Sequence, residues 1–153
     1  FNTYGPRMRL SDGRMIPEFI SNALAGNPIT IRGTRDDVGT FCYISDVLEA
    51  IVRMMQSRET GPINVGSPDQ ATFEQVAKKI IDIVGSRPDI RYEPPQEQTA
   101  KQGIPSIRQA REILGWFPVV PLDEGLRRTV DYMRGLRQVG LSSLGYAEND
   151  GNA

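Results

Sequence analysis

The chain has 153 residues, 39% of them hydrophobic and 24% charged, which is the composition of a globular protein and not of a disordered one. Its 19 acidic and 18 basic residues give a formal net charge of -1 and are spread along the chain, which argues against nucleic acid or an anionic membrane as a partner. The absence of histidine and the single cysteine, Cys42, disfavour a Ser/His/Asp triad, a zinc site and an internal disulfide.

No apolar run approaches the length of a membrane span, and the N-terminal residues lack the apolar core of a signal peptide. We therefore expect a cytoplasmic protein whose cysteine stays reduced.

The first quarter of the chain begins with an extended stretch over residues 1–3, which the Gly5-Pro6 pair ends. A loop follows over 7–14. Apolar residues at helical spacing then predict a helix over 15–25, with Gly26 as its stop.

Two short β-rich runs, 28–33 and 40–44, are predicted as strands joined by a polar loop. Asp46 with Glu49 three residues later is a capping-box pattern and predicts a helix of about three turns. Five apolar residues make one face of this helix, namely Val47, Leu48, Ile51, Val52 and Met55.

The second half of the chain begins with a predicted strand over 61–66, between glycines. Thr72 with Gln75 is a second capping-box pattern, and it predicts a helix that Gly85 ends. An edge strand is expected over 89–95.

Two further helices are expected, one beginning at Ser106 and one over 122–138, and fraying is expected from Val139 onward. About five helices and four or five short strands form an α+β or partial α/β set. This set has too few strands for a complete doubly wound sheet.

Several motifs in this order and spacing carry a family resemblance: "FNTYGPRM", "DGR", "PITIRG", "FCYISDV", "GPINVGSP" and "PSIRQAREILGWFPVVPLDEGL". From Phe1 to about Arg134 the chain resembles the C-terminal half of the extended short-chain dehydrogenase/reductase family, the NAD-dependent nucleotide-sugar epimerases, dehydratases and decarboxylases. Within that family it is most similar to the UDP-glucuronate decarboxylases.

The resemblance implies an α/β fold, namely the C-terminal part of a Rossmann-type enzyme and mainly its small α+β substrate-binding lobe. This lobe would span 1–138 and be followed by a frayed tail over 139–153. In the family, the glycine-rich NAD loop and a catalytic Tyr-x-x-x-Lys come before "FNTYGP". The sequence contains no G-x-G-x-x-G, no G-x-x-G-x-x-G and no Tyr-x-x-x-Lys. We therefore expect the NAD-binding part to be absent from this chain and to lie upstream in the parent protein.

The activity implied is decarboxylation of UDP-glucuronate, in which NAD takes a hydride from the sugar C4, carbon dioxide is lost from the resulting β-keto acid, and the hydride returns. Family members are commonly homodimers. A 4-epimerase or 4,6-dehydratase is one alternative. A binding module that has lost its catalytic site is another.

Position by position, Asn2 matches the family asparagine that touches the sugar diphosphate, although a strand-end amide would look the same. Tyr4 and Pro6 match residues beside the nicotinamide, and the alternative is a plain turn. Arg14 matches an arginine that reaches the substrate, and the alternative is a solvated loop arginine. Four further residues match walls around uracil and ribose, with core packing as the alternative for the first: Phe19, Ile29, Thr30 and Ile31.

Two positions depart from the family pattern, because Gly39 and Gly103 stand where the decarboxylases usually carry arginines. Losing two charge-assisted contacts would weaken binding by roughly a hundredfold to ten-thousandfold. Arg35 and Lys101 are close in sequence, and we hypothesise that they supply the charge from displaced positions.

Overall fold

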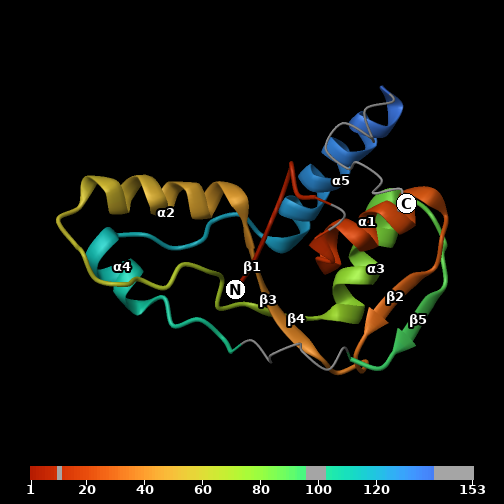
Figure 1. The fold of residues 1–153 in the computed structure, drawn as a ribbon, viewed down its shortest axis with the longest axis horizontal. Coiled ribbons are helices and arrows are strands. Elements are labelled where there is room, and N and C mark those ends of the chain that lie inside the picture. The colour runs from red at the N-terminus through yellow and green to blue at the C-terminus, as the bar shows by residue number, and fades with distance from the viewer. Residues whose placement is uncertain (10–11, 96–102, 140–153) are drawn as a thin grey trace, which may run out of the picture.

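The computed structural model describes residues 1–9, 12–95 and 103–139 (Figure 1). The described residues form five helices and five strands in the order β1 (Asn2–Tyr4), α1 (Met15–Ala25), β2 (Ile29–Arg32), β3 (Val38–Tyr43), α2 (Ile44–Gln56), β4 (Gln70–Thr72), α3 (Phe73–Val84), β5 (Ile90–Glu93), α4 (Arg108–Leu114) and α5 (Leu122–Gln138).

The strands form two small sheets. In the first, β1 pairs with β3 in parallel, and β3 pairs with β4 in antiparallel fashion, giving the order β1-β3-β4. In the second, β2 and β5 pair in parallel. The strands β2 and β3, neighbours in sequence, therefore lie in different sheets, and the architecture is of the mixed α/β class that the sequence predicts.

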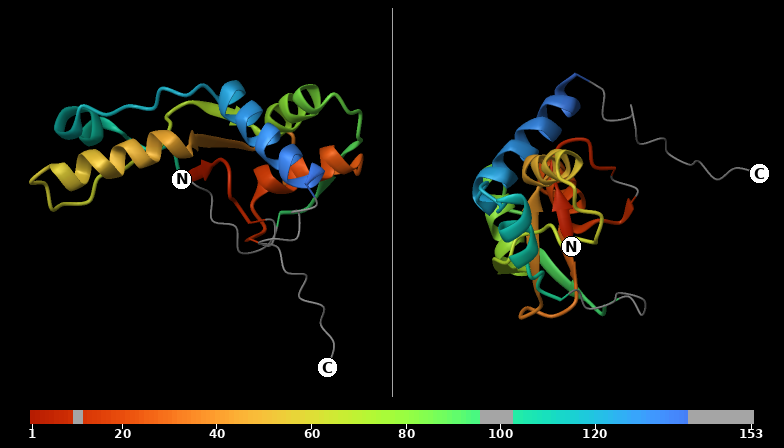
Figure 2. Two further views of the ribbon diagram at one scale, coloured as in Figure 1. Left: turned by 90° about the horizontal axis from the view of Figure 1, so that it is seen from above. Right: turned by 90° about the vertical axis from the view of Figure 1, so that its left-hand side faces the viewer.

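The larger core lies where α1, α3 and α5 pack against one another and against the strands (Figures 1 and 2). Helices α2 and α4 extend away from this body and enclose a smaller core, which consists of Cys42, Ala50, Ile107, Ala110 and Trp116. The larger core contains the end of β1, because Tyr4 is only 2% exposed.

Several predicted boundaries are confirmed. The α1 and α5 helices have the predicted bounds. The Thr72 side chain accepts from the Gln75 N–H, and the Gln75 side chain accepts from the Thr72 N–H, so the second capping box is present. Gly85 ends α3 in the left-handed conformation that favours glycine.

Two predicted elements are wrong in position, and the predicted tail over 139–153 lies almost wholly outside the described residues. Residues 61–66 form no strand, because Ile63 and Val65 pack against the smaller core as irregular backbone, and the strand pairing with β3 is made instead by residues 70–72. Helix α4 begins at Arg108, two residues after Ser106. Of the predicted tail, only Val139 lies within the described residues, where it caps α5.

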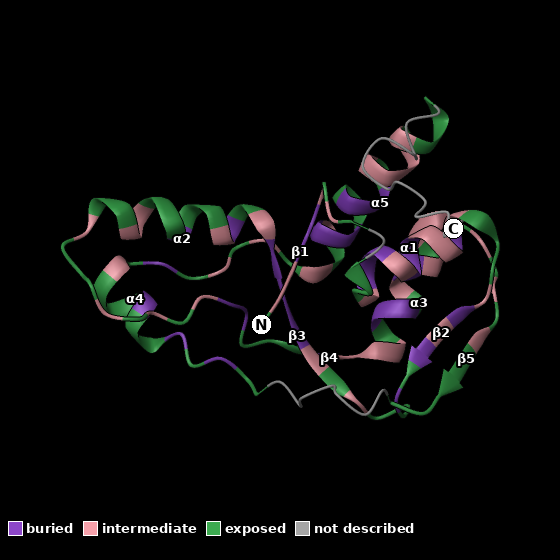
Figure 3. Cartoon of the chain, in the orientation of Figure 1, coloured by how far each residue is buried: buried purple, intermediate pink, exposed green. Residues whose placement is uncertain are grey.

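The expected capping box at the start of α2 is also wrong. The helix begins at Ile44 with Tyr43 as its N-cap, so Asp46 lies inside the first turn and forms no capping box with Glu49. Most of the apolar face of α2 is exposed, with Met55 80% accessible (Figure 3). The buried side of α2 carries Asp46 and Ala50 instead.

None of the helices in the described ranges combines the length and the hydropathy that crossing a lipid bilayer requires.

Candidate functional site

A cleft of about 380 Å³ opens where β1 ends. It brings together three predicted site residues, Tyr4, Pro6 and Arg14, from the end of β1, the following turn and the start of α1. The rest of its lining comes from Thr3, Gly5, Arg7, Met8, Arg9, Asp12 and Ile44.

The backbone after β1 is shaped by the Gly-Pro turn. Gly5 has φ 153, and a Cβ there would overlap the Ile44 side chain at the start of α2, so only glycine fits. The Gly5 N–H donates to the Met8 sulfur at 3.3 Å. Arg7 adopts the left-handed conformation with φ 67, which is uncommon for a residue with a Cβ and turns the chain around the cleft.

The cleft has a cationic lining. Arg7, Arg9 and Arg14 are all exposed, whereas Asp12 is the one acidic residue in the lining. Within the described ranges, no ion pair involves any of these three arginines. Guanidinium groups suit phosphate and carboxylate geometry, so the cleft can hold an anionic ligand.

Tyr4 contributes to the wall of the cleft as a fixed core residue. Its hydroxyl donates to the Leu122 carbonyl at 3.2 Å, and its ring packs edge-on against Tyr43 with 5.6 Å between centroids. Burial, followed by the nearby Tyr43, raises the pKa of the Tyr4 phenol far above its ordinary value. The phenol therefore stays protonated at neutral pH and is not suited to acid-base chemistry.

Asn2 pairs with Phe41 across the β1-β3 ladder, and its side chain lies near Gly39, two residues before Phe41. A Cβ at Gly39 would lie 3.3 Å from the Asn2 Nδ2 atom, 3.1 Å from Phe41 and 3.0 Å from Phe73. The rings of Phe41 and Phe73, which pack edge-on, thus occupy the space next to position 39. Glycine at position 39 therefore fits the space that the two rings leave, and an arginine there would have to displace these rings.

Arg35 lies outside the cleft. Its guanidinium sits 5.7 Å above the Tyr92 ring and pairs with Glu74 at 3.5 Å, and these contacts raise its pKa, with Tyr92 the larger cause. Gly103 is exposed with open space around it. Lys101 lies outside the described residues. It therefore stays a prediction that Arg35 and Lys101 supply the charge missing at positions 39 and 103.

The residues expected near uracil and ribose are mostly core residues. Phe19 is 1% exposed, and Ile29 and Ile31 are fully buried, so their side chains are packed in the larger core and are not on a surface that a ligand can reach. In this structure these three side chains pack in the core, and their expected contact with uracil and ribose stays a prediction. Thr30 is partly exposed and pairs with Arg91 in the second sheet, away from the cleft lining.

Sequence reasoning missed the role of Asp46, which is 4% exposed. Its carboxylate accepts from the N–H groups of Val119 and Val120 at 3.0 Å each, and its carbonyl accepts from the Trp116 indole at 2.8 Å. Trp116 is thus a packing residue of the smaller core. Asp46 fixes the segment that leads to Leu122, the residue that accepts from Tyr4.

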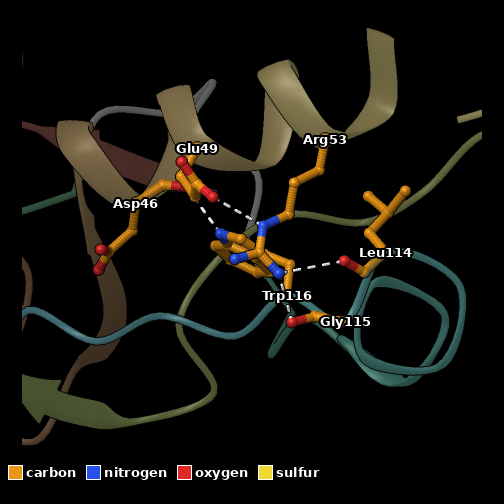
Figure 4. Close-up of polar contacts among 6 residues, drawn as sticks. All are labelled: Asp46, Glu49, Arg53, Leu114, Gly115 and Trp116. Carbon is orange, nitrogen blue, oxygen red and sulfur yellow. Dashed lines mark hydrogen bonds and ion pairs between the residues drawn. The ribbon is translucent and has the colours of Figure 1, made fainter. Parts of the chain in front are cut away.

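Figure 4 shows a second set of contacts along the same helix. Glu49 pairs with Arg53 at 2.7 Å, and Arg53 donates to the carbonyls of Leu114 at 3.2 Å and Gly115 at 2.6 Å, which are the last carbonyls of α4. A cation at a helix C-terminus satisfies carbonyls that lack helical partners. The acidic residue three positions after Asp46 therefore serves an i,i+4 pair and not a cap.

Arg7 and Arg9 were also missed as cleft residues. The signal available in the sequence was the run "GPRMR", in which two arginines follow a Gly-Pro turn, but periodicity does not say which way a loop side chain points. A second hollow of about 260 Å³, between β3, β4 and residues 118–122, contains none of the predicted site residues.

Comparison with known proteins was made on sequence and on fold. The profile of the NAD dependent epimerase/dehydratase family matches residues 1–66. UDP-glucuronic acid decarboxylase 1 of Xenopus tropicalis is 40% identical over 134 residues, which is 88% of this chain and 32% of the relative. UDP-glucuronic acid decarboxylase 3 of Arabidopsis thaliana is 38% identical over 82% of this chain and 37% of the relative. The chain thus spans about a third of these relatives.

Two solved structures extend the likeness to the fold. UDP-glucose 4-epimerase from Thermotoga maritima, solved with UDP-glucose, superposes with a TM-score of 0.84 and 31% identity over 89% of this chain and 44% of its own. UDP-glucuronic acid 4-epimerase from Bacillus cereus, solved with UDP-glucuronic acid and NAD, gives a TM-score of 0.81 and 27% identity, again over 89% and 44%. The fold is thus that of less than half of each of these enzymes.

Proposed function

We propose that this chain belongs to the NAD-dependent epimerase/dehydratase family and forms the substrate-binding lobe of a UDP-glucuronate decarboxylase. One observation carries the choice of reaction, namely the 38 to 40% identity to curated UDP-glucuronic acid decarboxylases over most of this chain. A UDP-glucuronate 4-epimerase is the second candidate, and the fold similarity to the Bacillus cereus enzyme favours it.

The cleft at the end of β1 supports this proposal because its chemistry fits an anionic sugar nucleotide. UDP-glucuronate carries a diphosphate and a carboxylate, and Arg7, Arg9 and Arg14 offer planar donors to such groups. Arg14 in addition lies at the N-terminus of α1, where the helix dipole favours negative charge. We assign Arg14 to the substrate, together with Asn2 on the neighbouring strand.

The cofactor of the proposed enzyme is NAD, which supplies hydride transfer when bound. This chain contributes only the positioning of the reacting groups, because its sequence lacks the glycine-rich phosphate loop of NAD sites. We place the nicotinamide beside Tyr4 and Pro6 in the cleft wall and the rest of NAD on a separate part of the parent protein. We further place the parent protein in the cytoplasm as a homodimer.

The first test is binding of UDP-glucuronate to the chain, measured by isothermal titration calorimetry. Arg14→Ala removes a charge-assisted contact of about 1.5 to 3 kcal/mol, so we expect the dissociation constant to rise roughly ten- to hundredfold. Arg111→Ala, on the exposed side of α4, is the matched control and should leave binding unchanged. Arg35→Ala tests the hypothesis that Arg35 supplies the charge missing at position 39. An unchanged dissociation constant for UDP-glucuronate would contradict that hypothesis.

The ligand class is tested with the same titration. Failure to bind UDP-glucuronate, UDP, dTDP and GDP alike would overturn the proposal and leave a module without a nucleotide-sugar site. The reaction is tested on the chain combined with an NAD-binding part. Release of carbon dioxide from UDP-glucuronate indicates a decarboxylase, whereas inversion at C4 without carbon dioxide indicates the epimerase.

A further inference from the structure

The first residue of α2 forms part of the wall of the cleft. Ile44 lines the cleft together with Tyr4, Gly5 and Pro6. Its side chain lies directly on Gly5, because a Cβ built at Gly5 would overlap the Cγ2 atom of Ile44 and lie 3.0 Å from its Cβ. The start of α2 therefore limits how the chain can turn after β1.

The segment between α4 and α5 holds the residue before that turn. The Tyr4 hydroxyl donates to the carbonyl of Leu122, the first residue of α5, and Tyr4 is buried. Residues 116–121 lead directly into Leu122. A shift of this segment would therefore change the position of the Tyr4 ring in the wall of the cleft.

Asp46 connects these two parts of the wall, although it does not line the cleft itself. It is buried in the first turn of α2, two residues after Ile44. The Oδ2 atom of its carboxylate accepts from the N–H groups of Val119 and Val120, and its backbone carbonyl accepts from the Trp116 indole. Three hydrogen bonds thus fasten the start of α2 to the segment before α5.

The Asp46 carboxylate is compensated by these backbone groups. Within the described ranges, none of the ion pairs involves Asp46. Burying a carboxylate is unfavourable unless hydrogen bonds compensate it, and the N–H groups of Val119 and Val120 supply them. Hydrogen bonds to a charged acceptor are stronger than neutral ones, so they fix the position of this irregular segment firmly.

We propose that Asp46 is a positioning residue for the ligand of the cleft. It sets the distance between the first turn of α2 and the segment before α5, and it thereby holds Ile44 against Gly5 and Tyr4 against Leu122. The inference rests on the proposed function for the identity of the ligand, UDP-glucuronate. Binding sites need their groups held to within about 0.5 Å, so a displaced acceptor at position 46 weakens binding without touching the ligand.

The test uses two substitutions that separate the position of the acceptor from its charge. Asp46→Asn keeps an oxygen acceptor at the same distance from the backbone and removes the charge, whereas Asp46→Glu keeps the charge and lengthens the side chain by one methylene. Val76→Ala is the matched control, because it removes methyl groups from the larger core and lies outside the lining of the cleft. Urea unfolding gives the free energy of unfolding of each variant.

Binding of UDP-glucuronate to the 153-residue chain is measured by isothermal titration calorimetry. We expect Asp46→Glu to raise the dissociation constant about tenfold and Asp46→Asn to change it less than about twofold. Val76→Ala should leave it unchanged, although this variant also loses free energy of unfolding. Ile44→Ala cuts the contact with Gly5 and should raise the dissociation constant about threefold, which keeps the inference testable if Asp46→Glu does not fold.

Two further measurements need no ligand. Trp116 is the single tryptophan of the sequence and donates to Asp46, so its fluorescence emission should shift in Asp46→Glu and stay unchanged in Asp46→Asn and Val76→Ala. The amide signal of Gly5 in a proton–nitrogen NMR spectrum should follow the same pattern, because Gly5 lies under Ile44.

The inference is overturned if folded Asp46→Glu or Ile44→Ala binds UDP-glucuronate as tightly as the unsubstituted chain. It is also overturned if Asp46→Asn binds as weakly as Asp46→Glu, which would assign the effect to charge, or if Val76→Ala weakens binding equally, which would assign it to stability. An unsubstituted chain that binds no UDP-glucuronate contradicts the proposed function instead. The Gly5 signal then decides the inference, which fails if that signal is the same in Asp46→Glu as in the unsubstituted chain.

Discussion

Tyr4 lines the cleft, and substitutions at two glycines of α5 test its position. A Cβ at Gly125 would overlap the Tyr4 hydroxyl and lie 2.8 Å from its Cζ atom and 2.9 Å from the Tyr43 ring. Gly135, ten residues later in the same helix, has open space around it. The same substitution by alanine therefore has opposite consequences at the two positions.

The magnitudes follow from these contacts. Gly125→Ala gains about 1 kcal/mol of helix propensity but overpacks the core at a cost of about 1 to 3 kcal/mol. It also separates Tyr4 from the Leu122 carbonyl, which costs about 1 kcal/mol. The net expectation is a loss of about 1 to 3 kcal/mol, whereas Gly135→Ala should gain up to about 1 kcal/mol.

Urea unfolding followed by circular dichroism measures both effects, with the slope m unchanged. Since Tyr4 also forms the wall of the cleft, Gly125→Ala should weaken UDP-glucuronate binding and Gly135→Ala should not. If the two variants have free energies of unfolding within about 0.5 kcal/mol of each other, the close packing of α5 on Tyr4 is refuted.

Two further predictions concern buried polar groups. Asp46→Ala leaves the N–H groups of Val119 and Val120 without their acceptor, so it should lower the free energy of unfolding by about 3 kcal/mol and remove amide-exchange protection at both groups. Ser45→Ala, on the exposed side of the helix, is the control and should change neither the stability nor the protection. Protection that persists in Asp46→Ala would contradict the assigned contact. Burial raises the pKa of the Cys42 thiol from 9.0 to about 12, so the folded chain holds this proton more tightly than the unfolded chain. The free energy of unfolding should therefore fall as pH rises from about 9 to about 12, and it should fall less in Cys42→Ala. An identical pH profile for the two proteins would argue against a buried thiol.

Local signals in the sequence predicted the elements well where they act within a few residues. The Thr72 and Gln75 side chains form their capping box with backbone three residues away, and Gly26 and Gly85 end their helices as expected. The run 61–66 has the composition of a strand, but whether it pairs depends on a partner distant in sequence, and β3 pairs with residues 70–72 instead. Local propensity does not contain that information.

The site was predicted in part for the same reason. Arg14, Tyr4 and Pro6 meet in one cleft because β1, the Gly-Pro turn and the start of α1 are close in sequence. Asp46 could not be assigned, because a carboxylate that begins a helix pattern looks like a cap, whereas its partners Val119 and Val120 are more than 70 residues away. The core packing of Phe19, Ile29 and Ile31 depends on contacts with distant elements, which local sequence patterns do not show.

The α2 helix shows what apolar periodicity measures. The pattern over Val47 to Met55 predicts the helix correctly, but apolar spacing alone does not say whether another element covers that face, and here most of it is exposed. In this chain the covered side is marked by Asp46, Ala50 and Arg53, whose contacts reach α4 and the segment after it. The apolar residues on the other side therefore have no role in the packing of the described chain.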